Sequence, residues 1–108
     1  MLQITQRRQE GTLIAVYTGE LDHHAARAAI EQTEDLLVLF PCEKLVLDLS
    51  ELTFMDSSGI ALILKAYKIT RAQGGTLALA NPTRQVQRVM ETSGIQRIVP
   101  TLEPAGKE

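Results

Sequence analysis

The sequence places an acid, two serines and a glycine in a row, at Asp56, Ser57, Ser58 and Gly59. A serine hydroxyl can serve as a nucleophile, and it can also accept a phosphate that another protein transfers. The same residue types commonly begin a helix, because their side-chain oxygens bond the first free backbone N–H groups. Three hypotheses therefore compete for these serines: a helix start, a nucleophile, and a site on which another protein acts.

A nucleophilic serine needs a base within reach and an acid that orients the base. His23 or His24, with Asp22, Asp48 or Asp56, would have to supply these parts. However, the run DSSG differs from the GxSxG elbow, and the run DHH is equally typical of a helix cap followed by two exposed first-turn residues. We therefore expect no enzyme activity and rank a serine nucleophile third among the hypotheses.

Cofactor and metal sites lack their usual signals. The glycine pair at residues 74–75 follows a predicted helix, and no GxxxxGK[ST] loop is present. With the single cysteine Cys42 and two adjacent histidines, a site of four metal ligands is barely constructible. We expect neither a metal nor a cofactor.

The charge balance argues against two classes of partner. The chain has 11 basic and 13 acidic residues, which leaves no excess to hold nucleic acid or an anionic membrane. No apolar run approaches the roughly 20 residues needed to cross a bilayer, and the first ten residues lack the apolar centre of a signal peptide. We expect no nucleic acid partner, no membrane association and a cytoplasmic location.

The first part of the chain predicts a hairpin and then an amphipathic helix. Apolar and polar residues alternate over residues 2–8, residues 10–11 are typical of a turn, and residues 12–18 have strand composition. Helical spacing follows over residues 25–40, and Asp22 is placed to cap this helix. Its apolar face comprises Ala26, Ile30, Thr33 and Leu37.

The middle of the chain predicts a buried strand followed by a helix. Residues 45–47 are apolar between polar ends, as in a central strand covered on both faces. A helix is predicted from Ser57 to Ala72, ending at a glycine pair that can take the left-handed conformation. Its uninterrupted apolar run, residues 60–64, offers more faces than one sheet can cover, so we expect something else to cover the remainder.

The last third predicts a strand, a helix and a frayed end. Residues 76–80 have strand composition, and Asn81-Pro82 is typical of a cap and first helical residue. This helix is expected to end at Ser93-Gly94, followed by an edge strand within residues 95–99. Residues 100–108 have too little apolar content to pack, so we expect them to fray. The inward face of the helix should comprise Val86, Val89 and Met90.

Together these elements predict one α/β domain over residues 1–108, because the length allows a single core. The opening hairpin followed by alternating strands and helices favours a mixed sheet with mostly parallel central strands, packed with three to four helices. Ser57 then lies after a parallel strand, at the edge where open α/β sheets gather their functional sites.

A phosphate at the start of a helix can be accommodated without unfolding, because it meets backbone N–H groups and the positive end of the helix dipole. It adds about 1.5 to 2 negative charges at neutral pH. Beside Asp56, and with Asp22 and Glu20 nearby, it would make a mildly acidic surface strongly acidic. A partner docked there would be repelled while the fold stayed intact.

Two segments carry a resemblance to a known family: GELDHHAA at residues 19–26 and LSELTFMDSSGIALILKAYK at residues 49–68. Together they resemble the STAS domains and, within them, the bacterial anti-sigma factor antagonists of the sporulation type. The similarity continues through GGTLALANPTRQVQRVMETSGIQRIV. The resemblance implies that Ser57 is phosphorylated by a partner that is both an anti-sigma factor and a serine kinase.

The resemblance also implies how the switch works. Unphosphorylated antagonist binds the kinase and frees the sigma factor, phosphorylated antagonist dissociates, and a phosphatase resets it. Two alternatives stay open: a stress-response antagonist, and a STAS module that binds a nucleotide or small anion. The partner surface carried over to this chain comprises Glu20, Asp22, His23, His24, Asp56, Ser58, Gly59 and Ile60, with Ser57 as the acceptor.

Overall fold

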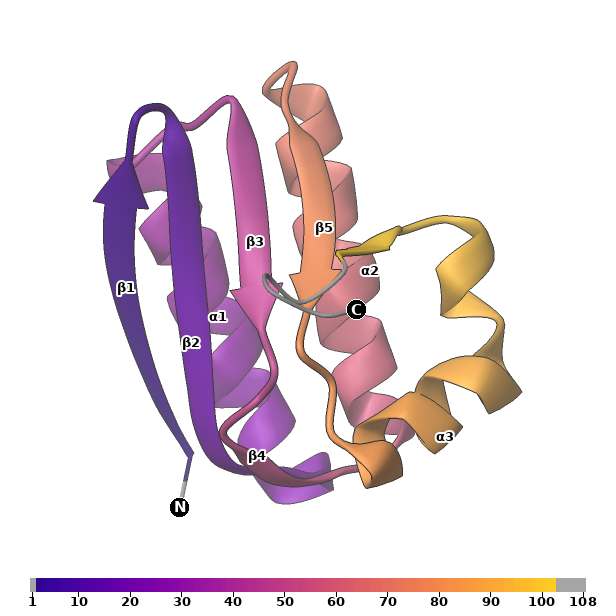
Figure 1. The fold of residues 1–108 in the computed structure, drawn as a ribbon. Coiled ribbons are helices and arrows are strands. Elements are labelled where there is room, and N and C mark those ends of the chain that lie inside the picture. The colour runs from indigo at the N-terminus through magenta and orange to yellow at the C-terminus, as the bar shows by residue number, and fades with distance from the viewer. Residues whose placement is uncertain (1, 103–108) are drawn as a thin grey trace.

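The computed structural model describes residues 2–102 and shows a sheet with helices packed against one of its faces (Figure 1). No helix within these residues is long and apolar enough to cross a membrane. In chain order the elements are β1 (Gln3–Gln9), β2 (Thr12–Leu21), α1 (His23–Leu39), β3 (Lys44–Asp48), β4 (Leu52–Met55), α2 (Ser57–Ala72), β5 (Thr76–Ala80), α3 (Arg84–Ser93), a 3-10 helix (Ile95–Arg97) and β6 (Thr101–Leu102).

The sheet confirms the predicted hairpin and the parallel central strands. Its order is β1-β2-β3-β5-β6, with β1 antiparallel to β2 and the other neighbours parallel. Strand β4 lies off this path and pairs in parallel with the last residues of β2. The first half of β2, residues 12–16, pairs with β3, and its last residues, 19–21, pair with β4. The pairing with β4 shifts register between Gly19 and Glu20.

The core lies between the sheet and helices α1 and α2, which run behind it in Figure 1. Alternate residues of β2, including Leu13, Ala15 and Tyr17, point toward these helices and are fully buried. The Tyr17 hydroxyl lies 2.8 Å from Thr33 Oγ1 of α1, and this buried contact satisfies both polar groups. Burial raises the pKa of Tyr17 to about 12, while the hydrogen bond to Thr33 acts in the opposite direction.

The apolar run at the start of α2 is covered by the chain itself. Ile60, Leu62 and Ile63 are 8%, 1% and 1% exposed, and Leu64 is half-buried. Helix α2 packs against α1 and also contacts α3 and β5, so three elements surround it. The apolar residues that one sheet could not cover are therefore mostly buried by other elements of the same domain.

Helices α1 and α2 follow the predictions closely, whereas the connection before α2 and the start of α3 differ. Strand β4 was not predicted, and it lies within the connection between β3 and α2. Helix α3 is capped by Thr83, whose side chain accepts from the Val86 amide, and not by Asn81, which has a φ of 54°. A left-handed residue cannot form the extended cap that leads into a helix, so the prediction of Asn81-Pro82 as the helix start is wrong.

The end of the described chain also differs from the prediction. Residues 95–97 form a 3-10 helix instead of an edge strand, because Gly94 is left-handed and directs Ile95 and Val99 into the core. The edge strand is β6, which pairs with Leu79 and Ala80 of β5. Thus residues 101–102 do not fray, and the remainder of that prediction, residues 103–108, lies outside the described residues.

Candidate functional site

The segment GELDHH forms the junction between β2 and α1. Glu20 and Leu21 end the strand, and His23 and His24 are the first two residues of the helix. Asp22 caps α1, as predicted, because its Oδ1 accepts a hydrogen bond of 3.0 Å from the Ala25 amide. Glu20, His23 and His24 are exposed.

The segment DSSG forms the junction between β4 and α2. Asp56 is the N-cap of α2: its Oδ1 accepts from the Ser58 amide at 2.8 Å, and its carbonyl accepts from the Gly59 amide at 2.9 Å. The serines are therefore the first two residues of the helix, and the acid is its cap. Ser57 is exposed, and among the described residues no hydrogen bond involves its hydroxyl.

The two junctions lie side by side. Strand pairing sets Glu20 against Phe54 and Leu21 against Met55, and the Asp56 amide donates to the Leu21 carbonyl at 3.3 Å. The second carboxylate oxygen of Asp56 then accepts from the His23 amide at 3.1 Å. One carboxylate thus holds the N-termini of both α1 and α2, which brings together the two segments that the sequence singled out.

Gly59 and Ile60 lie at the inner side of this site. Gly59 is buried, and a Cβ built on it would lie 2.3 Å from Met55 Cγ and 3.2 Å from a Leu21 methyl carbon. The absence of a side chain is therefore needed for α2 to approach β4 and β2. Ile60, only 8% exposed, keeps one edge open to an adjoining groove.

This groove runs between the start of α2 and helix α3 and has a volume of about 390 Å³. The hydroxyl-bearing Ser57 stands at its α2 side, while Arg88 and Val89 contribute from α3. The sequence did not indicate that α3 forms one wall of this groove. Val89 was expected to face the core, but it is only half-buried. The lining residues are Ser57, Ile60, Arg88, Val89, Thr92 and Ser93.

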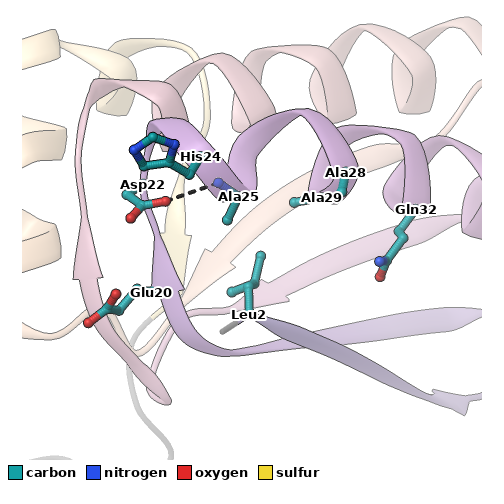
Figure 2. Close-up of a pocket in the computed structure, with 8 residues that line it drawn as sticks. All are labelled: Leu2, Glu20, Asp22, His24, Ala25, Ala28, Ala29 and Gln32. Atoms are coloured by element: carbon teal, nitrogen blue, oxygen red, sulfur yellow. Dashed lines mark hydrogen bonds between the residues drawn. The ribbon is translucent and has the colours of Figure 1, made fainter.

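A second cavity of about 360 Å³ lies beside the start of α1 and is shown in Figure 2. Small side chains of α1 and Leu2 form its apolar part, and two carboxylates, Glu20 and Asp22, stand at its polar end. Carboxylates repel an anion, so this cavity is unsuited to a nucleotide phosphate. The lining residues are Leu2, Glu20, Asp22, His24, Ala25, Ala28, Ala29 and Gln32.

The carboxylates considered for a catalytic triad are already engaged with backbone amides. Asp22 and Asp56 cap helices, and Asp48 accepts from the Ser50 amide at 3.0 Å. The contact between Asp56 and His23 uses the peptide N–H of the histidine and not its imidazole. Between residues 2 and 102, no hydrogen bond links an imidazole to either serine.

Comparison with known proteins identifies the fold and the family. The family model for the STAS domain matches residues 3–106. The chain belongs to the STAS-domain family. An anti-sigma F factor antagonist of Paenibacillus polymyxa is 38% identical over 99 residues, covering 92% of this chain and 85% of the relative. An anti-sigma-B factor antagonist of Bacillus subtilis is 24% identical over 98 residues, covering 91% and 88%.

Solved structures extend the comparison to proteins of known fold. The anti-sigma factor antagonist SpoIIAA, in its unphosphorylated form, superposes with a TM-score of 0.77 at 26% identity, covering 95% of this chain and 89% of its own. SpoIIAA of Bacillus in its phosphorylated form gives a TM-score of 0.68 at 25% identity, covering 95% and 92%. This STAS domain therefore shares its architecture with a protein that has been solved with and without a phosphate.

Proposed function

We propose that this STAS domain is an anti-sigma factor antagonist whose binding is switched by phosphorylation of Ser57. In the unphosphorylated form it binds an anti-sigma factor that is also a serine kinase, and so frees the sigma factor. Transfer of phosphate to Ser57 ends the binding, and a phosphatase restores the active form. The observation that carries the proposal is the exposed Ser57 at the start of α2, beside the Asp56 carboxylate that joins both candidate segments.

The surroundings of Ser57 support a charge switch. Asp56 is adjacent, and Glu20 and Asp22 lie on the neighbouring junction, so a phosphate would add its charge to a surface that already carries three carboxylates. Like charges that face each other across a protein–protein interface weaken association. Because Ser57 is exposed and its hydroxyl makes no hydrogen bond within the described residues, modification would break no hydrogen bond of the fold.

The docking surface that we propose has two parts. One is the rim formed by Glu20, Asp22, His23 and His24, which is largely exposed beside Asp56. The other is the groove between α2 and α3, where an apolar side chain of the partner would contact Ile60 and Val89. Ser58 is half-buried and bonded through its amide to Asp56, so we propose it as a neighbour of the acceptor. Gly59 contributes by letting α2 sit close to β4.

The relatives favour one pathway over the other. The antagonist of anti-sigma F is 38% identical and the antagonist of anti-sigma B is 24% identical to this chain. These identities support our proposal that the domain acts in the sporulation pathway, in the cytoplasm and without enzyme activity of its own. The stress-response role is the alternative.

The proposal is tested with the anti-sigma F factor of Paenibacillus polymyxa, the target named for the 38% identical relative. Incubation with this protein and ATP should place one phosphate on Ser57, as mapped by peptide mass spectrometry. Binding measured by calorimetry should be preserved in Ser57→Ala and weakened about tenfold or more in Ser57→Asp, because the added carboxylate mimics part of the phosphate charge.

Ser50→Asp is the matched control, since it adds the same charge at an exposed serine in the loop after β3. It should bind like the unmodified chain. Phosphate confined to Ser58, or equal affinities for Ser57→Ala and Ser57→Asp, would contradict the assignment of Ser57 as the switch.

A further inference from the structure

Gln85, in the first turn of α3, makes a paired contact with the backbone of β4. Its Oε1 accepts from the Met55 amide at 2.9 Å, and its Nε2 donates to the Met55 carbonyl at 2.8 Å. The side-chain amide therefore bonds both backbone groups of one residue, as a neighbouring strand would. Figure 1 shows the start of α3 near the end of β4, and the two elements are in contact.

The position of this contact in the chain gives it a consequence for Ser57. Met55 is the last residue of β4, Asp56 follows as the cap, and Ser57 begins α2. Within residues 2–102, β4 pairs with β2 alone, so its outer edge has no strand partner. Gln85 supplies the missing hydrogen bonds at Met55, two residues before the proposed acceptor Ser57.

We propose that Gln85 is a positioning residue that locks the junction Met55–Ser57 to α3 and so fixes the Ser57 hydroxyl for phosphate transfer. The inference rests on the proposed function for its kinetic consequence, whereas the lock itself concerns the free protein. Helix α3 also carries Arg88 and Val89, which line the groove beside Ser57. The lock therefore fixes the position of Ser57 relative to the α3 residues that line the groove.

The first test measures hydrogen exchange of backbone amides by NMR on the free domain. Gln85→Ala removes both bonds, and Gln85→Glu keeps the acceptor for the Met55 amide but removes the donor to its carbonyl. Gln87→Ala, two residues along the same helix and exposed, is the matched control. We expect the Met55 amide to exchange about tenfold faster in Gln85→Ala, because two hydrogen bonds are lost. The Ser57 and Ser58 amides should also exchange faster.

The second test measures Ser57 phosphorylation by the Paenibacillus polymyxa anti-sigma F factor with ATP at a temperature where every variant is folded. A loosened junction lowers the fraction of bound chains that present the hydroxyl correctly, so kcat should fall at least about threefold while KM stays within about twofold. A purely structural role would lower the melting temperature and leave kcat unchanged. Gln87→Ala should match the parent chain in both tests.

The outcomes separate the two proposals. Unchanged exchange at Met55 in both Gln85 variants, or equal changes in Gln87→Ala, would overturn the lock whatever the kinase does. Faster exchange with an unchanged kcat would overturn the positioning role. If the parent chain takes no phosphate on Ser57, the proposed function fails, and the positioning role fails with it, while accelerated exchange at residues 55–58 would still support the lock in the free protein.

Discussion

Replacing Asp56 with alanine should destabilise the domain more than removing an ordinary helix cap, because this carboxylate serves two helices. Its Oδ1 accepts from the Ser58 amide of α2 at 2.8 Å, and its Oδ2 accepts from the His23 amide of α1 at 3.1 Å. Loss of an N-cap costs about 1 kcal/mol. Hydrogen bonds to charged groups contribute about 1.5 to 3 kcal/mol, and we take about 1 kcal/mol for the exposed His23 contact.

The expected loss for Asp56→Ala is therefore about 2 kcal/mol in the free energy of unfolding, which is measured by urea denaturation. For a domain of this size it corresponds to a fall of about 9 °C in melting temperature. Asp22→Ala is the matched control, because within residues 2–102 the Asp22 side chain accepts a hydrogen bond from the Ala25 amide of α1 alone. It should cost about 1 kcal/mol. Asp56→Asn keeps one acceptor oxygen, so its free energy of unfolding should lie between those of the parent and Asp56→Ala.

If Asp56→Ala and Asp22→Ala are equally destabilised, within about 0.5 kcal/mol, the bond from His23 contributes nothing to stability and the bridging role of Asp56 is wrong. Hydrogen exchange at the His23 amide gives an independent check. It should become faster in Asp56→Ala and remain unchanged in Asp22→Ala.

Three further predictions follow from the packing and the backbone. Gly59→Ala should lose about 1 to 3 kcal/mol, because its Cβ would lie 2.3 Å from Met55 Cγ; a cost below about 0.5 kcal/mol in urea denaturation would show that Met55 moves aside freely. Burial raises the Tyr17 pKa from 10.0 to about 12, so Tyr17 ionises at lower pH in the unfolded chain than in the folded one. The stability that the neutral Tyr17 contributes is therefore fully present below pH 10, and the free energy of unfolding falls by up to about 3 kcal/mol as the pH rises to about 12. Tyr17→Phe should lack this component, and an identical alkaline loss in both proteins would contradict the assignment. Since Asn81 has a φ of 54°, Asn81→Gly should be tolerated, whereas Asn81→Val should lower the melting temperature by several degrees, about 1 to 2 kcal/mol.

The parts of the fold that could be predicted have strong local signals. Helix α2 spans the predicted residues, because a long apolar run is bounded by an acid on one side and by a glycine pair on the other. The residues of β3 were predictable from three consecutive apolar residues between polar ends. The cap of α1 by Asp22 follows from the ordinary preference for a carboxylate before a helix.

The parts that could not be predicted depend on contacts between distant residues. Strand β4 has four residues and exists because β2 is long enough to pair with a second strand beyond the residues that pair with β3. Nothing local distinguishes Gln85 from other glutamines on exposed helices, since its partner lies 30 residues away. For the same reason, the sequence indicated both candidate segments of the site but not the Asp56 carboxylate that joins them.

The bridging carboxylate also changes how a phosphate at the start of α2 should be understood. The sequence alone suggested that a phosphate on Ser57 would find free N–H groups at the helix start. In the structure, the Ser58 amide is bonded to the Asp56 carboxylate and the Gly59 amide to the Asp56 carbonyl. A phosphate on Ser57 would have to displace that carboxylate to reach the Ser58 amide, and the displacement would also release α1 at His23. Because both helix N-termini are stabilised by the present bonds, a phosphate on Ser57 would be better placed outward, next to Asp56, where its charge would face a docking protein instead of being neutralised by the fold.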